Sequence, residues 1–182
     1  MARMVLVTGG SRSGKSEFAR HFAQTVPGRR AFVATCPVVD EEMKERIEKH
    51  RRQRAQSDWQ TIEEPIDLRK ILLESSAFSV FLIDCLTLWV NNLLYAAQEQ
   101  NRSFSEEDAV EKCAELVDAA RNVDGTVVIV TNEVGWGIVP ENAAARLFRD
   151  IVGRCNETVA AAADEVFLIV CGYPVILKKG NR

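Results

Sequence analysis

The sequence lacks a long uninterrupted apolar run. Its longest apolar stretch, Val80–Ala97, is broken by Asp84, Asn91 and Asn92, so it falls short of the roughly 20 apolar residues that a membrane helix needs. The apolar run Met4–Val7 is too short for the hydrophobic region of a secretory signal. We therefore expect no membrane span and a cytoplasmic location.

The sequence also lacks an excess of charge of one sign and any paired cysteines. The net charge is −3, which argues against a strongly basic nucleic-acid binder, so no nucleic-acid partner is expected. The five cysteines are odd in number and none forms a C-x-x-C pair, which argues against a disulfide framework or a zinc site and fits a reducing cytosol. We expect small buried thiols at Cys36, Cys85, Cys113, Cys155 and Cys171.

Internal repeats, low-complexity stretches and linkers are absent as well. The chain has 182 residues, of which 47% are hydrophobic and 27% are charged, an ordinary composition for a globular protein. A length of about 100–200 residues is the usual size of one domain. We predict a single domain over residues 1–182, with Gln98–Ser103 as its most flexible surface loop.

Continuous apolar runs alternate with helical patterns along the chain. Such runs are typical of strands buried on both faces of a parallel sheet, and their alternation with helices predicts an α/β fold with helices on both faces. Gly172-Tyr173-Pro174 separates the last two strands, which predicts a C-terminal hairpin at a sheet edge. The expected strands are Met4–Thr8, Ala31–Thr35, Val80–Asp84, Thr126–Thr131, Val166–Cys171 and Val175–Leu177.

The expected helices have recognisable start signals. Asp40 is a plausible N-cap, Ser105 with Asp108 resembles a capping box, and Pro140 suits a first helical turn. The expected helices are Lys15–Thr25, Asp40 to about Gln56, Ile66–Glu74, Leu86–Gln98, Ser105–Asn122 and Pro140–Ala163.

A phosphate-binding motif lies between the first strand and the first helix. Gly9–Ser16 reads G-G-S-R-S-G-K-S and matches G-x-x-x-x-G-K-[ST] in full. Backbone N–H groups of such a loop face a phosphate, and the following helix adds its positive end. Lys15 is placed to reach the β and γ oxygens, and Ser16 to bind Mg²⁺. We predict nucleotide binding by Gly9, Gly10, Ser11, Arg12, Ser13, Gly14, Lys15 and Ser16.

Asp84 ends an apolar strand. In P-loop proteins a carboxylate at that place holds Mg²⁺ directly or through water. The alternative is an N-cap for the helix Leu86–Gln98, and the two roles are compatible.

His50 lies in a basic helical segment, R-I-E-K-H-R-R-Q-R. At about 100° per residue, Met43, Ile47, His50 and Arg54 share one face. A histidine on such a face is commonly a packed core or boundary residue. The alternative is a nucleophile, because neutral imidazole attacks phosphorus and later leaves it, and the surrounding cations disfavour the imidazolium. Spacing alone leaves both open.

Five blocks of the sequence together resemble one enzyme family, adenosylcobinamide kinase/adenosylcobinamide-phosphate guanylyltransferase. The resemblance covers about Met4 to Lys178, and the R-I-x-x-H-R and T-N-E-V-G blocks are far more specific than the P-loop. The blocks are LVTGGSRSGKSEFAR, FVATCP, RIEKHRRQR followed by DWQTIEEP, LIDCLTLWVNNLL, and TNEVGWGIVPENAAARLFRDIVGRCNETVAAAADEVFLIVCG.

The resemblance implies a function in cobalamin assembly. The family phosphorylates adenosylcobinamide with a nucleoside triphosphate, ATP or GTP. It then transfers GMP from GTP to adenosylcobinamide phosphate through a guanylyl-histidine and releases pyrophosphate. His50 matches that histidine, which favours the nucleophile over the packed residue. A RecA-like three-layer P-loop fold and a homotrimer are also implied.

The resemblance carries further nucleotide-binding positions over to this chain, in addition to the glycine loop. Mg²⁺ is the expected metal, at Ser16 and Asp84. The further positions are Ala34, Thr35, Cys36, Arg51, Arg52, Gln53, Arg54, Glu63 and Asp84.

The loop that starts at Asn132 is placed where α/β sheets bind ligands, at the carboxyl end of a strand. Trp136 either stacks on a flat corrin or covers the core. Glu133 acts either as a general base for the substrate hydroxyl or as a structural hydrogen-bonding residue. Two other function classes compete: a P-loop kinase without a covalent intermediate, and a GTP switch or RecA-like motor. The motif N-K-x-D that a switch would show is missing at Asn132-Glu133.

Overall fold

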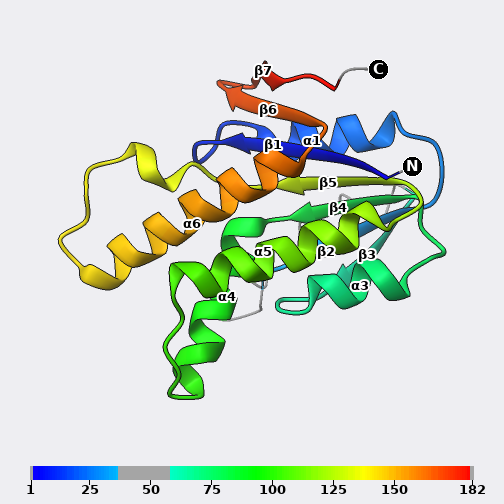
Figure 1. Ribbon diagram of the computed structural model, residues 1–182. Coiled ribbons are helices and arrows are strands. Elements are labelled where there is room, and N and C mark those ends of the chain that lie inside the picture. The colour runs from blue at the N-terminus through cyan, green and yellow to red at the C-terminus, as the bar shows by residue number, and fades with distance from the viewer. Residues whose placement is uncertain (1, 37–57, 181–182) are drawn as a thin grey trace.

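The computed structural model describes residues 2–36 and 58–180, and a seven-stranded sheet forms its centre (Figure 1). The order across the sheet is β3-β2-β4-β5-β1-β6-β7. The expected helix Asp40–Gln56 lies outside the described residues. The strands are β1 (Arg3–Gly9), β2 (Arg30–Ala34), β3 (Trp59–Glu63), β4 (Val80–Asp84), β5 (Thr126–Val130), β6 (Glu165–Val170) and β7 (Tyr173–Lys178).

The sheet is parallel except for its last strand. β1 pairs with β5 and β6, β2 pairs with β3 and β4, and β4 pairs with β5, all in parallel. β7 pairs with β6 in antiparallel fashion. The predicted α/β fold with a C-terminal hairpin is therefore confirmed, and the carboxyl ends of six strands meet at one edge.

Helices cover both faces of this sheet, which makes three layers. On one face, Ala19 and Ala23 of α1 pack against buried strand residues, and on the other face helices α3 to α6 form the larger core. Figure 1 shows α3, α5 and α6 together on the near side of the sheet. The helices are α1 (Lys15–Gln24), α3 (Leu68–Glu74), α4 (Leu86–Glu99), α5 (Glu106–Arg121) and α6 (Ala143–Ala162), with a 3₁₀ turn, η1 (Val134–Trp136).

Side-chain caps set where several helices begin. The capping box between Ser105 and Asp108 is present at the start of α5, as predicted. Asp67 caps α3 through the N–H of Lys70. Asn142 caps α6 through the N–H of Ala145. The helix predicted from Pro140 therefore begins at Ala143, because the Asn142 side chain takes a hydrogen-bond donor of the first turn.

Strand β3 has no counterpart among the predicted strands. Its sequence, W-Q-T-I-E, is half-exposed along its whole length and lies at the sheet edge next to β2. An edge strand has one neighbour, so it needs no continuous apolar run of the kind that marks the central strands.

The C-terminal hairpin turns one residue earlier than predicted. Cys171 and Gly172 form a two-residue turn and both have left-handed backbone angles, with φ of 52° and 86°. Two-residue hairpin turns of type I′ require positive φ at both positions. Tyr173 and Pro174, predicted as turn residues, belong to β7 instead.

Candidate nucleotide site

The glycine loop follows β1 and is seated on neighbouring backbone. A Cβ at Gly9 would lie 2.6 Å from the carbonyl oxygen of Ile169. Gly14 has a left-handed φ of 93°, and a Cβ there would lie 3.2 Å from Cα of Gly172. The N–H of Gly172 donates a 2.8 Å hydrogen bond to the Ser13 carbonyl. Both glycines are therefore required by close backbone approach, and the β6–β7 turn supports the loop.

The amino-terminal end of α1 offers donors for an anion. Gly14 is its N-cap and makes no side-chain cap, so the first N–H groups of the helix have no side-chain partner at this position. The Ser13 hydroxyl is buried and has no hydrogen-bond partner among residues 2–36 and 58–180. Ser16, in the first turn, is exposed. Such an end, with its helix dipole, is a phosphate-binding arrangement.

Lys15 lies beneath the loop and is 9% exposed. Its Nζ donates a 3.1 Å hydrogen bond to the Gly10 carbonyl. Burial lowers the pKa of Lys15, and the nearby Asp84 and Cys85 oppose this shift. The Lys15 ammonium is thus held between the glycine loop and the end of β4.

Asp84 is the last residue of β4. The N-cap of α4 is Cys85, without a side-chain cap, so the N-cap role considered for Asp84 is wrong. A carboxylate and the hydroxyl of Ser16 are hard oxygen donors of the kind that Mg²⁺ prefers. These two residue types therefore fit the metal, at the end of β4 and the start of α1.

The ends of β2 and β3 lie beside Asp84. In the sheet register, Ala34 is paired with both Asp84 and Glu63. Thr35 is fully buried, and its hydroxyl donates to the Cys85 carbonyl at 2.8 Å and accepts from the Cys85 N–H at 2.7 Å. Thr35 thus holds β2 against β4, while the half-buried Cys36 follows it.

A largely buried polar network joins the ends of β1 and β5 to Asn156 in the interior of α6. The Thr8 hydroxyl donates to Oε1 of Glu133 at 2.6 Å, and Nδ2 of Asn156 donates to the same oxygen at 3.3 Å. Asn156 also donates to the Asn132 carbonyl and accepts from the Thr131 hydroxyl. These contacts support the structural hydrogen-bonding role considered for Glu133, whose N–H also donates to the Gly9 carbonyl.

Asn92 is a second buried anchor, on α4. Its Nδ2 donates to the carbonyls of Thr35 at 2.7 Å and Pro65 at 3.0 Å. The sequence signal for it was a polar residue inside the otherwise apolar run around Leu93. The predicted site residues did not include Thr8, Asn92 or Asn156. Their hydrogen bonds hold the segments that carry the site in place.

The end of η1 and the loop after it are open to solvent. Trp136 is 67% exposed and Ile138 is 96% exposed. In this chain Trp136 does not cover the core, which was one of the two roles considered for it.

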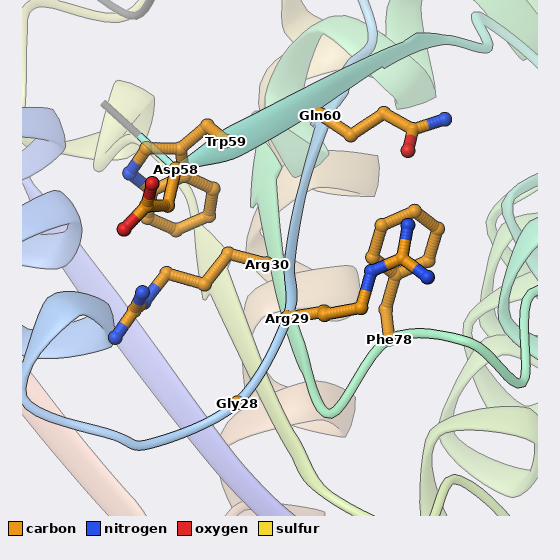
Figure 2. A pocket seen from close by; sticks show the side chains of 7 residues that line it. All are labelled: Gly28, Arg29, Arg30, Asp58, Trp59, Gln60 and Phe78. Carbon is orange, nitrogen blue, oxygen red and sulfur yellow. The ribbon is translucent and has the colours of Figure 1, made fainter. Parts of the chain in front are cut away.

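A pocket of about 600 Å³ lies elsewhere, at the amino ends of β2 to β4. Figure 2 shows the Arg29 guanidinium in front of the Phe78 ring, and the distance to the ring centroid is 5.3 Å. Arg30 extends toward the end of α1, where it donates to the carbonyls of Gln24 and Val26. Both arginines are thus engaged by the chain itself, and this pocket is separate from the glycine loop.

The structure brings the glycine loop, Ala34, Thr35, Cys36, Glu63 and Asp84 to one edge of the sheet. His50 and the predicted nucleotide-binding residues Arg51, Arg52, Gln53 and Arg54 lie outside the described residues. In the described part, no helix is long and apolar enough to cross a membrane.

The sheet order and the glycine loop define a P-loop nucleotide-binding protein. The fold is similar to that of the RadB recombinase, with a TM-score of 0.50 and 16% identity over 91% of this chain and 73% of that one. It is also similar to an ATPase of a bacterial type III secretion system, with a TM-score of 0.57 and 10% identity over 91% of this chain and 50% of that one. At these identities the likeness concerns the fold alone.

The family model for cobinamide kinase / cobinamide phosphate guanyltransferase matches residues 5–177, so the chain belongs to that family of bifunctional kinases and nucleotidyltransferases. The bifunctional adenosylcobalamin biosynthesis protein CobU of Salmonella typhimurium is 41% identical over 96% of this chain and 99% of its own. CobU of Escherichia coli is 40% identical with the same coverage. CobP of Pseudomonas aeruginosa is 36% identical over 95% of this chain and 96% of its own.

Proposed function

We propose that this chain, folded as one domain over residues 1–182, phosphorylates adenosylcobinamide and then guanylylates the product. In the first step the substrate hydroxyl oxygen attacks the γ-phosphorus of ATP or GTP, loses its proton to a base and releases the nucleoside diphosphate. In the second step GMP passes from GTP to adenosylcobinamide phosphate. Membership of the cobinamide kinase / guanyltransferase family supports both activities.

The guanylyl transfer is proposed to run through His50. An imidazole nitrogen attacks the α-phosphorus of GTP. The bond between the α-phosphorus and the oxygen that bridges it to the β-phosphorus breaks, and pyrophosphate leaves. A phosphate oxygen of adenosylcobinamide phosphate then attacks the same phosphorus, the P–N bond breaks, and free imidazole returns. A nucleophile that also leaves easily divides one transfer into two lower barriers.

The single observation that carries the nucleotide part is the geometry around the glycine loop. Helix α1 begins without a side-chain cap, and the buried Ser13 hydroxyl has no partner in the described residues. Lys15 is held beneath the loop at the Gly10 carbonyl. The N–H groups at the start of α1 and the Ser13 hydroxyl are preorganised for a triphosphate, since no side chain of the described residues holds them, and Lys15 lies beside them. The ends of β2 and β3, with Ala34, Cys36 and Glu63, are proposed to line the nucleotide.

Ser16 and Asp84 are the proposed Mg²⁺ ligands. When bound, Mg²⁺ would neutralise charge on the phosphate oxygens. Lys15 would then orient the β and γ oxygens of the triphosphate. The hydrogen bonds among Thr8, Glu133 and Asn156 would keep the glycine loop in place.

Three further features belong to the same proposal. The exposed Trp136 is proposed to stack on the corrinoid, since a flat aromatic ring offers a large contact area. The enzyme is proposed to act as a homotrimer in the cytoplasm. The basic residues Arg51, Arg52 and Arg54 are proposed to balance the triphosphate charge next to His50, and Gln53 is proposed to contact the nucleotide as a neutral hydrogen-bonding side chain.

The test is incubation with α-labelled GTP and Mg²⁺ followed by mapping of the modified residue. We expect an acid-labile, base-stable label on His50, lost in His50→Ala together with guanylyl transfer. His21→Ala is the matched control, because His21 is the other histidine and pairs with Glu17 on the exposed face of α1. Label that persists in His50→Ala would show that another residue is the nucleophile. Phosphorylation of adenosylcobinamide without any label on the protein would indicate a kinase that forms no covalent intermediate.

A further inference from the structure

Arg149 lies on the buried face of α6. Val152 and Asn156, three and seven residues later, are 1% and 8% exposed on that face. Seven residues are nearly two helical turns, so Arg149 stands roughly 10 Å further along the helix axis in the same direction as Asn156. Asn156 contacts Glu133 at the carboxyl edge of the sheet. The face that begins in the core therefore continues past that edge to Arg149.

The direction of α6 carries this arginine toward the carboxyl edge of the sheet, where the candidate site lies. Figure 1 shows the amino-terminal part of α6 reaching beyond the arrowheads of β4 and β5. The helix also packs against η1 and α4, two of the elements that begin at this edge. Helical side chains lean toward the amino end of their helix, so the guanidinium of Arg149 lies further out than its own Cα.

The guanidinium of Arg149 is incompletely paired in the described residues. Its Nη1 is buried and has no hydrogen-bond partner there. Its ion pair with Asp150, the next residue, has a separation of 3.7 Å between Nε and Oδ1. Buried cationic donors normally have partners, because an unpaired one loses its hydration without compensation.

Neighbouring arginines of the same helix differ in this respect. Arg146 donates to the carbonyls of Pro140 and Glu141 at 2.9 and 2.6 Å. Arg154 donates to Glu157 at 2.8 Å. The carboxylate of Glu133 accepts from Thr8 and Asn156. Arg149 is thus the arginine of α6 with a buried nitrogen that has no hydrogen-bond partner in the described residues.

We propose that Arg149 binds a phosphoryl group of a substrate at the carboxyl edge of the sheet. A guanidinium presents a planar pair of donors that matches two phosphate oxygens. The glycine loop holds the nucleotide phosphates against α1, on the other face of the sheet. Arg149 therefore faces the second phosphorylated substrate, the phosphomonoester that accepts GMP. The inference rests on the proposed function for the identity of that acceptor.

The test compares Arg149→Gln and Arg149→Lys with Arg154→Gln, an exposed control on the same helix. Equilibrium dialysis of the coloured corrinoid measures binding without turnover, for cobinamide phosphate and for unphosphorylated cobinamide. GTP binding and the melting temperature are measured in parallel. We expect Arg149→Gln to weaken cobinamide phosphate binding by roughly tenfold to a hundredfold, the range for hydrogen bonds to a charged group. Binding of unphosphorylated cobinamide should change less than about twofold.

The remaining arms separate the sources of the phosphoryl group. A loss confined to GTP binding would assign the same contact to a nucleotide phosphate. Arg149→Lys should recover part of the affinity, because charge remains while the planar fork is lost. Equal binding of both corrinoids and of GTP by wild type and Arg149→Gln would overturn the proposal. So would a loss of equal size for the phosphorylated and unphosphorylated corrinoid. A wild type that binds cobinamide phosphate without transferring GMP would instead contradict the proposed reaction.

Discussion

The hydroxyl of Thr8 donates a 2.6 Å hydrogen bond to Oε1 of Glu133. The backbone adds a second link, since the N–H of Glu133 donates to the Gly9 carbonyl at 3.2 Å. Thr8 directly precedes the glycine loop, and Glu133 lies three residues after Val130, the last residue of β5. The start of the loop is therefore tied to the neighbouring strand, and through Asn156 to α6.

Glu133→Gln distinguishes the two roles considered for this carboxylate. The amide keeps an oxygen that can accept from Thr8, so a positioning residue should lose less than about tenfold in kinase rate. A general base should lose about a hundredfold or more. Initial phosphorylation rates and GTP binding check this, with Glu141→Gln as an exposed control. Glu133→Ala should in addition weaken GTP binding, because Thr8 and Asn156 both lose their acceptor.

Gly14→Ala should impair nucleotide binding and stability. A residue with a side chain at a φ of 93° is strained, and its Cβ would lie 3.2 Å from Cα of Gly172. We expect a loss of about 1–2 kcal/mol in the free energy of unfolding and a lower GTP affinity.

The matched control is Gly153→Ala in α6. Nothing lies within 4 Å of a Cβ at Gly153, and alanine favours helix over glycine by up to about 1 kcal/mol. Urea unfolding should therefore show opposite signs for the two variants. Equal signs would contradict the assigned role of the glycine loop geometry.

Lys15→Met should remove the effect of GTP on stability without harming the free protein. Burial lowers the pKa of Lys15, so the native state holds this proton less well than the unfolded state. The buried charge therefore destabilises the free protein in full below the lowered pKa. This penalty shrinks as the pH rises above that pKa, and it vanishes above the ordinary pKa of 10.5 that the unfolded state keeps. Melting curves should show that the variant gains most near neutral pH and least at high pH. Lys112→Met, on the exposed face of α5, should show neither the gain nor the loss of GTP response.

Asn92→Leu should destabilise the fold. The buried amide donates to the carbonyls of Thr35 and Pro65, which would lose their shared donor. We expect a loss of about 1–3 kcal/mol in the free energy of unfolding. The neighbouring Asn91 is exposed, so Asn91→Leu should change this free energy by less than about 0.5 kcal/mol. A similar loss in both variants would mean that the two hydrogen bonds contribute little.

The thiols should differ sharply in reactivity. Burial raises the pKa of Cys85 to about 12, and the contact with Cys155 together with burial raises the pKa of Cys113. Both thiols therefore stay protonated at pH 8, where the thiolate is the reactive form. Iodoacetamide mapping by mass spectrometry should find Cys171, which is exposed, modified in the native protein. Cys85 and Cys113 should react after unfolding, and their rapid native labelling would contradict this arrangement.

The sequence by itself determined the features that depend on neighbouring residues. The motif Gly9–Ser16 lies between a strand and a helix as its spacing predicted. The capping box of Ser105 and Asp108 is formed by residues three positions apart. The continuous apolar runs mark the central strands, because those strands are buried on both faces. Local spacing and burial leave a direct record in the residue order.

Only the tertiary structure decided which distant segments meet. The order β4-β5-β1 separates Asp84 from the glycine loop by a whole strand, and no local pattern specifies that order. The bonds of Thr8 to Glu133 and of Asn92 to Thr35 join residues 125 and 57 positions apart. The burial of Arg149 Nη1 without a hydrogen-bond partner in the described part of the chain likewise depends on how α6 packs. Such contacts depend on how whole helices and strands pack together. Local patterns of neighbouring residues do not specify that packing.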